Sequence, residues 1–352
     1  MSKIGIIGTG QMCRAHLHTL KLIKGIELVA VCDIHKENLR NVEYEVKELR
    51  IPGWRDLRTF TDWGKLLRIQ DIEAVLISTP NYTHRDIAVA ALEAGKHVLC
   101  EKPMAIRARD CREMIKAQRK SRKSLQIGLE YRHAPLYRKV KHLIEKGEIG
   151  TPWMLWCKEF RSPYIKKTED WILQREKSGG SLVEKDCHHF DLFNWYTESK
   201  PVRVAAFGGN EVIYREWDIL DHAWVIVEYE SGARACLGLC FFIPYGNDIL
   251  EMGIIGDDGK LESYATPMQI VRWKRKKPLK KVFSVYVPPR IKKESHQGAI
   301  YYEWRYFMKV IQGKASPYPD GEIGLWSVAI PQAAEIAIQD KRVVEIQEVL
   351  HD

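Results

Sequence analysis

The sequence predicts two domains, a doubly wound parallel α/β domain followed by an α+β domain built on one large, mostly antiparallel sheet. Short apolar strands alternate with helical segments over residues 1–128, and the first strand runs directly into a glycine-rich turn. Longer strands with alternating polarity dominate residues 129–352. At 352 residues the chain is long enough for two domains, because one takes roughly 150 residues. We therefore divide the chain into 1–128 and 129–352.

The first strand, turn and helix carry a nucleotide-binding signature. Residues 3–7 form a short apolar strand, and GTGQMC (8–13) leads into a helical run over 14–22. This matches the G-x-G-x-x-G/A fingerprint of a Rossmann domain in its required setting, with Cys13 in place of the third small residue. The glycines allow a pyrophosphate to approach the positive end of the helix. We expect cofactor contacts from Gly8, Gly10, Gln11 and Met12.

The second strand strengthens this prediction and indicates which dinucleotide binds. Residues 27–32 are apolar and β-branched, and they end at Asp33, 23 residues after Gly10. An acidic residue at this spacing hydrogen-bonds the adenosine ribose hydroxyls and disfavours a 2′-phosphate. NAD is therefore preferred over NADP, although His35 and Lys36 lie close enough to soften the preference. The alternative is that Asp33 is simply a turn residue.

Two later strands end in polar segments. The strand 71–78 runs into STPNYTH (78–84), and after a helix over 85–94 a short strand, 98–100, runs into Glu101-Lys102-Pro103. The ligand crevice of an open parallel sheet lies outside the carboxyl ends of its strands, so both segments should face it. Taken alone, a lysine is most often a solvated surface charge. The expected cofactor contacts here are Ser78, Thr79, Pro80, Asn81, His84, Glu101 and Lys102.

The fingerprint, STPNYTHRDIAVAALEAGKHVLCEKPM (78–104) and LEYRHAPLYRKVKHLIEKGEIG (129–150) together resemble the Gfo/Idh/MocA family of NAD(P)-dependent sugar and polyol oxidoreductases. The resemblance runs from residue 3 to the C-terminal helix. It implies a second domain whose open sheet face forms the interface of a homodimer or homotetramer. Strands expected in that sheet are 153–160, 202–207, 223–229, 233–242 and 250–255, followed by helices over 300–312 and 325–339.

A second polar cluster lies in SGGSLVEKDCHHFD (178–191), which reads as a glycine turn followed by a helix reaching about Tyr196. Glu184, His188 and Asp191 are spaced i, i+4, i+7 and so share one helix face. A histidine satisfied inside the core, or a surface ion pair, would give the same pattern. The resemblance implies the motif G-G-x-x-x-D-x-x-x-H-x-x-D, in which His188 and Asp191 match and Glu184 replaces an aspartate.

What the resemblance implies is hydride transfer between nicotinamide and a secondary hydroxyl of a cyclic polyol or sugar. His188 would accept the hydroxyl proton, Lys102 would hydrogen-bond the same oxygen and Glu184 would bind a neighbouring hydroxyl. One alternative is a redox-neutral, NAD-assisted elimination, hydrolysis or epimerisation; another is a non-catalytic NAD(H)-responsive binding protein. Substrate contacts are expected from Tyr131, Arg132, Tyr164, Asp170, Trp171, Lys185 and Asp191.

Composition argues against several other classes of partner. The net charge of +9 includes one dense basic block, 273–281, which we interpret as an exposed hairpin and not a nucleic-acid arm. No segment approaches the ~18 apolar residues of a membrane helix, and no signal peptide is recognised. The eight cysteines form no CxxC pair, which suits free thiols and a cytoplasmic location. Metal binding by Cys187, His188, His189 and Asp191 is not expected, because neighbouring helix residues diverge.

Overall fold

The computed structural model describes residues 1–165, 167–276, 279–293 and 295–351 and consists of two compact units. Unit 1 contains Met1–Ala105, Asp110–Ala134 and Val287–Leu325. Unit 2 contains Ile106–Arg109, Pro135–Tyr286 and the chain from Trp326 onward. This division differs from 1–128 and 129–352 chiefly because residues 287–325 return to the first unit.

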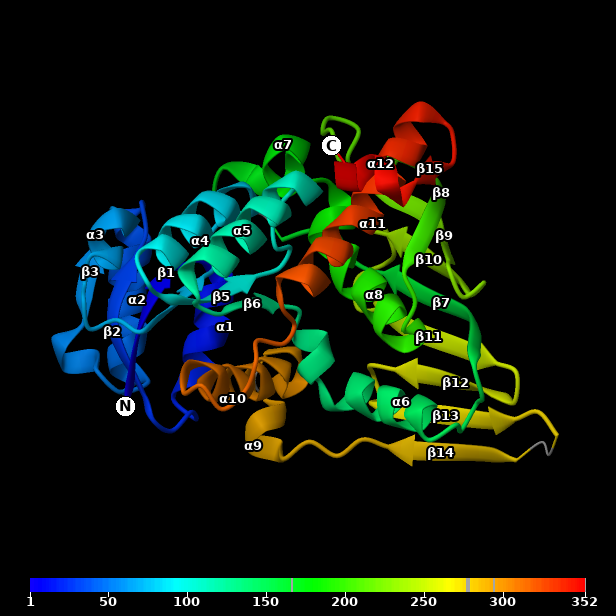
Figure 1. The fold of residues 1–352 in the computed structure, drawn as a ribbon, viewed down its shortest axis with the longest axis horizontal. Helices are drawn as coiled ribbons and strands as arrows, with labels where there is room; N and C mark the ends of the chain where they lie inside the picture. Colours follow the sequence, from blue (N-terminus) through cyan, green and yellow to red (C-terminus); the bar gives the residue numbers. More distant parts are fainter. Residues whose placement is uncertain (166, 277–278, 294, 352) are drawn as a thin grey trace. The chain divides into compact units, whose positions relative to one another are not determined.

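Unit 1 is built on a six-stranded sheet in the order β3-β2-β1-β4-β5-β6, in which every neighbouring pair is parallel (Figure 1). The predicted doubly wound parallel sheet is therefore confirmed. The strand β3 was not predicted, because its three residues show no apolar periodicity. The strands are β1 (Ser2–Ile7), β2 (Ile26–Cys32), β3 (Arg58–Phe60), β4 (Ala74–Ile77), β5 (His97–Glu101) and β6 (Leu125–Gly128).

Helices connect these strands and form the rest of unit 1. Gly95, in the left-handed region at φ +75°, follows α4 as the sequence predicts for a helix end. Short 3₁₀ turns lie at Asn81–Thr83, Glu130–His133 and Ser295–Gly298. The helices are α1 (Gln11–Leu20), α2 (Lys36–Glu48), α3 (Trp63–Leu67), α4 (His84–Glu93), α5 (Ala108–Ser121, which starts in unit 2), α9 (Pro289–Lys292) and α10 (Ala299–Ile311).

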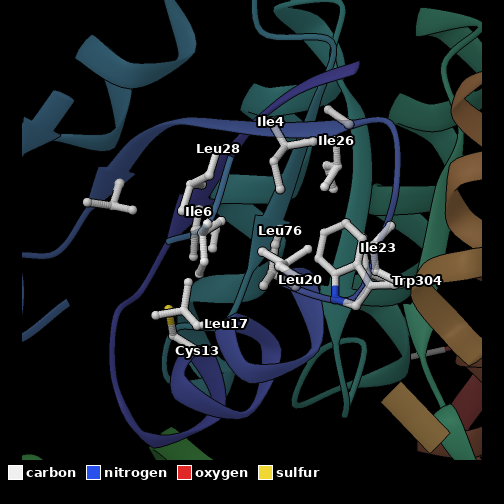
Figure 2. Packing of buried hydrophobic residues seen from close by; sticks show 14 of the residues in the cluster. Ile4, Ile6, Cys13, Leu17, Leu20, Ile23, Ile26, Leu28, Leu76 and Trp304 are labelled. Atoms are coloured by element: carbon white, nitrogen blue, oxygen red, sulfur yellow. The ribbon is translucent and has the colours of Figure 1, made fainter. Parts of the chain in front are cut away.

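The core of unit 1 explains why α10 belongs to it. Ile300, Trp304 and Phe307 recur at helical spacing on α10, and each is at most 1 % exposed. They join a buried cluster with residues of β1, α1 and β2, in which Trp304 lies beside Leu20 and Ile23 (Figure 2). Burial of large aromatic side chains is among the strongest apolar contributions to stability. Residues nearly 300 positions apart thus form one core.

Unit 2 contains a nine-stranded sheet in the order β14-β13-β12-β11-β7-β10-β9-β8-β15 (Figure 1). Only the β7–β10 pair is parallel, so the expected large, mostly antiparallel sheet is confirmed. The strands are β7 (Pro152–Phe160), β8 (Pro201–Gly209), β9 (His222–Tyr229), β10 (Arg234–Cys240), β11 (Ile249–Gly256), β12 (Gly259–Tyr264), β13 (Gln269–Lys274), β14 (Lys280–Ser284) and β15 (Val344–Glu345).

The two faces of this sheet differ. The helix α8 contacts β7 and β10, and α6 contacts β12 and β13, so helices cover one face. On β9, Val225 and Val227 are buried, whereas Trp224 and Ile226 are about half exposed at 54 % and 51 %. One face therefore carries exposed apolar side chains. The helices of unit 2 are α6 (Pro135–Glu145), α7 (Arg175–Ser178), α8 (Ser181–Thr197), α11 (Gly321–Asp340, which starts in unit 1) and α12 (Ile346–His351).

Three smaller predictions can be compared with the structure. β13 and β14 pair antiparallel, as the hairpin interpretation of the basic block requires, while Lys277 and Pro278 lie outside the described residues. All eight cysteines are free thiols. Within the described ranges, the helices are too short or too polar to cross a bilayer.

Candidate functional site

The turn between β1 and α1 requires one glycine for its shape and leaves space at the other. Gly8 has φ +90°, and a Cβ there would lie 2.6 Å from the main chain of Ser78. At Gly10 no described atom lies within 4 Å of a Cβ position. Gly10 is also the N-cap of α1 and provides no side-chain cap, so the first N–H groups of the helix remain available to an anion. This open, uncapped helix end fits a dinucleotide pyrophosphate.

Asp33 is fixed at the carboxyl end of β2 by the same turn. The main-chain N–H and the hydroxyl of Thr9 donate to its Oδ2 at 2.8 and 2.9 Å, and the His35 N–H donates to its Oδ1 at 2.9 Å. Asn38 adds longer contacts of 3.3 Å. The carboxylate is thus oriented by the residues of the fingerprint, as expected of a group that binds ribose.

The loop 78–84 after β4 packs against the fingerprint. The Ser78 hydroxyl donates to the Gly8 carbonyl at 2.8 Å, and the Thr83 hydroxyl donates to the Thr79 hydroxyl at 2.7 Å. His84 is fully buried, and its ring nitrogens lie 2.8 Å from the Pro103 carbonyl and 2.9 Å from the Thr79 carbonyl. Burial lowers the pKa of His84. His84 therefore joins two loops, and its contact with the cofactor stays a prediction.

Lys102 lies at the end of β5, where Pro103 prevents the strand from continuing, and the bond between them is cis. Its main-chain N–H donates to Glu101 Oε2 at 3.1 Å. Glu101 Oε1 lies 2.7 Å from Nε2 of the buried His16. Glu101 is only 5 % exposed, and both its oxygens have protein partners. Glu101 therefore joins His16 to the main chain of Lys102, and its predicted contact with the cofactor stays a prediction.

Two buried carboxyl groups near Lys102 were not predicted. Glu130 is 2 % exposed, and its Oε1 lies 2.5 Å from His296 Nδ1. Burial pushes the pKa of Glu130 upward, but the charges of His296 and Lys102 bring it below its ordinary value. Glu303 is 1 % exposed, and burial followed by the charges of Glu101 and Glu130 raises its pKa well above the ordinary value. No local pattern marks either residue, because both depend on long-range packing.

The expected substrate residues of unit 1 follow β6. Arg132 is 7 % exposed, donates to the Tyr318 hydroxyl at 2.9 Å and lies over the Tyr318 ring. The ring of Tyr131 meets that of His296 edge to face at 6.2 Å. Both side chains therefore contact the C-terminal part of unit 1.

In unit 2 the predicted polar face is carried by α8. The helix starts at Ser181 after Gly179 and Gly180, which have φ of +88° and +92°. A Cβ at Gly180 would lie 2.5 Å from a carboxyl oxygen of Glu335, so glycine is needed at this position. Glu184 is partly exposed on α8, while His188 and Asp191, one and two turns on, are 5 % and 1 % exposed.

Aromatic residues surround the Glu184 end of this face. The Tyr164 ring lies 4.4 Å from that of Phe241 and stacks with that of Tyr214 at 6.1 Å. Burial, followed by the charge of Glu184, raises the pKa of Tyr164 well above its ordinary value. Trp171 and Asp170 are partly exposed in the 3₁₀ turn Thr168–Leu173. Tyr164 and Glu184, predicted separately, are thus brought together.

Lys185 points to a protein partner. Its Nζ lies 3.2 Å from Oε1 of Glu159, a buried residue on β7. Arg161 and His189 lie 3.4 and 3.6 Å from the same carboxylate, which the sequence pattern did not single out. Burial pushes the pKa of Glu159 upward, but these neighbouring charges, with Lys185 first, lower it overall. Lys185 therefore belongs to a charge network within unit 2.

Among the described residues, one group has the spacing of metal ligands, and none of its members lies on α8. Its members are Glu211, Asp221 and His222, with donor atoms within 4.8 Å of one another. Asp221 Oδ2 already accepts the main-chain N–H of Val212 and that of Ile213, and its Oδ1 lies 2.6 Å from His222 Nδ1. The carboxylate therefore stabilises a turn.

The parallel sheet, the uncapped helix α1 and the oriented Asp33 define a dinucleotide-binding protein, and the buried polar face of α8 suggests an enzyme. Comparison with family models gives the particular class. Residues 2–129 match the oxidoreductase family with an NAD-binding Rossmann fold, and residues 137–262 match the GFO/IDH/MocA C-terminal domain. The chain belongs to the Gfo/Idh/MocA oxidoreductase family, and residues 2–129 form its NAD-binding Rossmann domain.

Individual relatives agree with this assignment. The chain is 30 % identical over 266 residues to inositol 2-dehydrogenase of Salmonella paratyphi B, covering 74 % of this chain and 73 % of the relative. It is 25 % identical over 353 residues to myo-inositol 2-dehydrogenase of Thermotoga maritima, covering 99 % of both. The structure of levoglucosan dehydrogenase with NADH has the same fold, with a TM-score of 0.83, 19 % identity and coverage of 98 % and 99 %. These relatives do not favour the redox-neutral alternative.

Proposed function

We propose that this enzyme oxidises a secondary hydroxyl group of a cyclic polyol or sugar, with NAD as hydride acceptor, and catalyses the reverse reduction. The observation that supports this most directly is the face of α8, where the buried His188 lies one turn from Glu184 and three residues from Asp191. A histidine flanked by carboxylates is suited to proton transfer from an alcohol. The relatives named as inositol 2-dehydrogenases support a polyol substrate.

When bound at the Rossmann domain, NAD would supply the hydride acceptor for this oxidation. His188 takes the hydroxyl proton, so the alcohol loses one hydride and one proton and becomes a carbonyl. Lys102, held at the end of β5, would donate a hydrogen bond to a substrate oxygen and stabilise its developing negative charge. Glu184 orients a neighbouring hydroxyl, and Asp191 helps to orient the polar face.

The ribose-binding carboxylate supports a preference for NAD over NADP. Asp33 is held by the main chain and hydroxyl of Thr9, so it cannot easily move aside for a 2′-phosphate. We expect kcat/KM with NAD⁺ to exceed that with NADP⁺ by roughly tenfold or more. The reason is that a 2′-phosphate beside the Asp33 carboxylate brings two negative charges together, which costs over about 1 kcal/mol. Initial rates with each cofactor at a saturating substrate concentration measure this ratio.

The first test is a substrate screen with NAD⁺, using inositols, aldoses, uronates and anhydrosugars and following reduced nicotinamide. We expect turnover with at least one cyclic polyol or sugar. If the protein binds NAD⁺ but reduces none of it with any member of the panel, the dehydrogenase proposal is wrong.

The second test replaces Lys102 by Met, which keeps length and removes the charge. We expect kcat to fall by roughly 10²-fold or more, because the oxyanion-stabilising donor is lost, with NAD⁺ affinity changed little. Lys116→Met, an exposed lysine on α5, is the matched control and should leave kcat unchanged. Normal turnover in Lys102→Met would exclude the assigned role.

We also propose that the open face of the unit 2 sheet forms the interface of a homodimer or homotetramer. Phe207, Trp224 and Met154 are 81 %, 54 % and 59 % exposed, which is unusual for a surface without a partner. Phe207→Glu should shift the molar mass measured by light scattering toward the monomer.

The free thiols, mostly buried, suit work in the reducing cytoplasm.

A further inference from the structure

Two buried residues distant from each other in sequence form a hydrogen-bond chain to Lys102. His16 lies on α1 and Trp304 on α10, and neither is exposed to solvent. Trp304 Nε1 and His16 Nδ1 are 2.8 Å apart. His16 Nε2 is 2.7 Å from Glu101 Oε1, and Glu101 Oε2 accepts the Lys102 main-chain N–H at 3.1 Å. All four residues belong to unit 1.

The chemistry of tryptophan gives this chain a direction. An indole N–H can only donate, so Nδ1 of His16 must be the acceptor and its lone pair is occupied. The ring hydrogen of His16 therefore lies on Nε2, from which it is donated to the Glu101 carboxylate. Glu101 in turn uses its other oxygen to hold the main chain of Lys102. One donor on α10 thus determines a hydrogen bond at the end of β5.

Other titratable groups face this hydrogen-bond chain. They are Lys102 at the end of β5, Glu130 after β6 and Glu303 on α10. Burial, followed by the charges of Glu101 and Glu130, raises the pKa of Glu303 well above its ordinary value. On another side of α1, Glu45 of α2 lies 3.1 Å from His18 and 3.7 Å from Arg14.

We propose that Trp304, His16 and Glu101 form a positioning relay, in which the indole fixes the tautomer of His16, His16 orients Glu101 and Glu101 holds Lys102 in place for hydride transfer. This inference rests on the proposed role of Lys102. The three relay members are positioning residues, since they act through Lys102. Because Nδ1 accepts the indole N–H, the relay keeps His16 in the tautomer with its hydrogen on Nε2.

Trp304 also fills the core beside Leu20 and Ile23 (Figure 2), and a packing role alone would predict a loss of stability and nothing more. The two roles are separated by Trp304→Phe, which keeps an aromatic ring and removes the N–H. Nδ1 of His16 is then free to take a proton. The resulting imidazolium draws the Glu101 carboxylate toward itself and weakens its hold on the Lys102 main chain.

The experiment measures kcat against pH from 5.5 to 8.5 for the full-length enzyme. We expect kcat of Trp304→Phe at pH 6, relative to pH 8, to fall roughly tenfold below the same ratio in the wild type, as small misplacements of catalytic groups have effects of this order. The matched control is Phe307→Leu, which disturbs the same buried cluster on α10, including its edge-to-face contact with the Trp304 ring at 5.8 Å, but removes none of the relay's hydrogen bonds. Its profile should keep the wild-type shape even if its melting temperature falls.

A double variant tests the assignment to His16. A glutamine side chain can accept and donate hydrogen bonds but does not titrate. Adding His16→Gln to Trp304→Phe should therefore remove the loss of kcat that Trp304→Phe shows at low pH. The relay would be overturned if the kcat–pH profiles of wild type and Trp304→Phe superimposed after scaling. It would also be overturned if the double variant still lost kcat at low pH.

The ¹⁵N chemical shifts of His16 provide a measurement that needs no substrate. In the wild type we expect an unprotonated Nδ1 and a protonated Nε2 throughout pH 6 to 8, whereas Trp304→Phe should gain a proton on Nδ1. A wild-type His16 with its hydrogen on Nδ1 would overturn the relay whatever the reaction is. The correct tautomer with no turnover on any substrate would instead count against the proposed function.

Discussion

His16 in unit 1 and His189 in unit 2 are both almost fully buried beside carboxylates, yet their ring nitrogens meet opposite partners. His16 receives a hydrogen bond from Trp304 on one side and faces Glu101 on the other. His189 faces carboxylates on both sides, with Nδ1 3.0 Å from Asp186 and Nε2 3.6 Å from Glu159. The indole N–H on one nitrogen fixes the tautomer of His16, whereas His189 has acceptors on both sides and no such donor.

The two units also compensate their buried acids differently. In unit 2, Lys185 and Arg161 surround Glu159 with positive charge and help to hold its pKa below the ordinary value. In unit 1, burial and the charges of Glu101 and Glu130 instead raise the pKa of Glu303 well above the ordinary value. Buried acids can thus be accommodated by pairing with cations or by remaining neutral, and the two solutions respond differently to mutation and pH.

The largest difference that we expect is in the free energy of unfolding, when one buried carboxylate is removed from each unit. Glu159→Gln leaves Lys185, Arg161 and His189 without their shared anion, and breaking such a buried group costs about 3–5 kcal/mol. Glu101→Gln leaves an amide oxygen to accept from His16, so the expected cost is about 1–2 kcal/mol. Urea unfolding followed by circular dichroism compares the two. Equal losses would show that cation pairing does not distinguish unit 2.

The next effect is a pH dependence expected from the unit 2 cluster. Burial, with the charge of Glu159, raises the pKa of Asp186 to about 6 from its ordinary 3.8. Between these values the unfolded chain has lost a proton that the folded chain still holds, so stability falls as pH rises and then levels off above pH 6. Asp186→Asn removes this pH-dependent contribution to the free energy of unfolding.

The stability of Asp186→Asn relative to wild type should therefore rise by up to about 3 kcal/mol from pH 4 to pH 6. Phe307→Leu in unit 1 removes no titratable group and is the matched variant, so its difference from wild type should stay constant over the same interval. Thermal or urea unfolding at several pH values measures both. A flat difference for Asp186→Asn would contradict the raised pKa.

Local signals were sufficient for the elements that position the proposed site. The strand and helix around Gly8 and Gly10 were predicted because the hydrophobic periodicity and the glycine turn indicate the same elements. The same holds for α8 after Gly179. Strand β3 was missed because Arg58–Phe60 is defined by its pairing with β2 and not by its own sequence. Residues 287–325 were assigned to the second domain because no local pattern shows that α10 returns to the core of unit 1.

Side-chain partners were predicted less well than positions. Lys185 stands beside the expected catalytic face, and only the structure shows that Glu159, on a distant strand, binds it. Glu101 and His84 were expected to face the cofactor, because the carboxyl end of a strand suggests a ligand. Their oxygens and nitrogens are used by His16, Thr79 and the main chain around Lys102. Such partners lie up to 85 residues away in the sequence, and a local hydrophobic pattern cannot predict a contact at that separation.

A third histidine–carboxylate pair gives the smallest expected effect. His296 contacts the buried Glu130 but is itself 42 % exposed, so solvent screens its charge. The depressed pKa of Glu130 stabilises the fold above the ordinary glutamate value, and this contribution is lost as pH falls through the folded value. His296→Gln keeps a hydrogen-bond donor and removes the charge, so it should cost no more than about 1 kcal/mol at pH 6 and nothing in acid, where Glu130 is protonated. Melting temperatures at pH 6 and pH 3.5 measure this, and a loss as large as that of Glu159→Gln would mean that exposure of the histidine does not weaken such a pair.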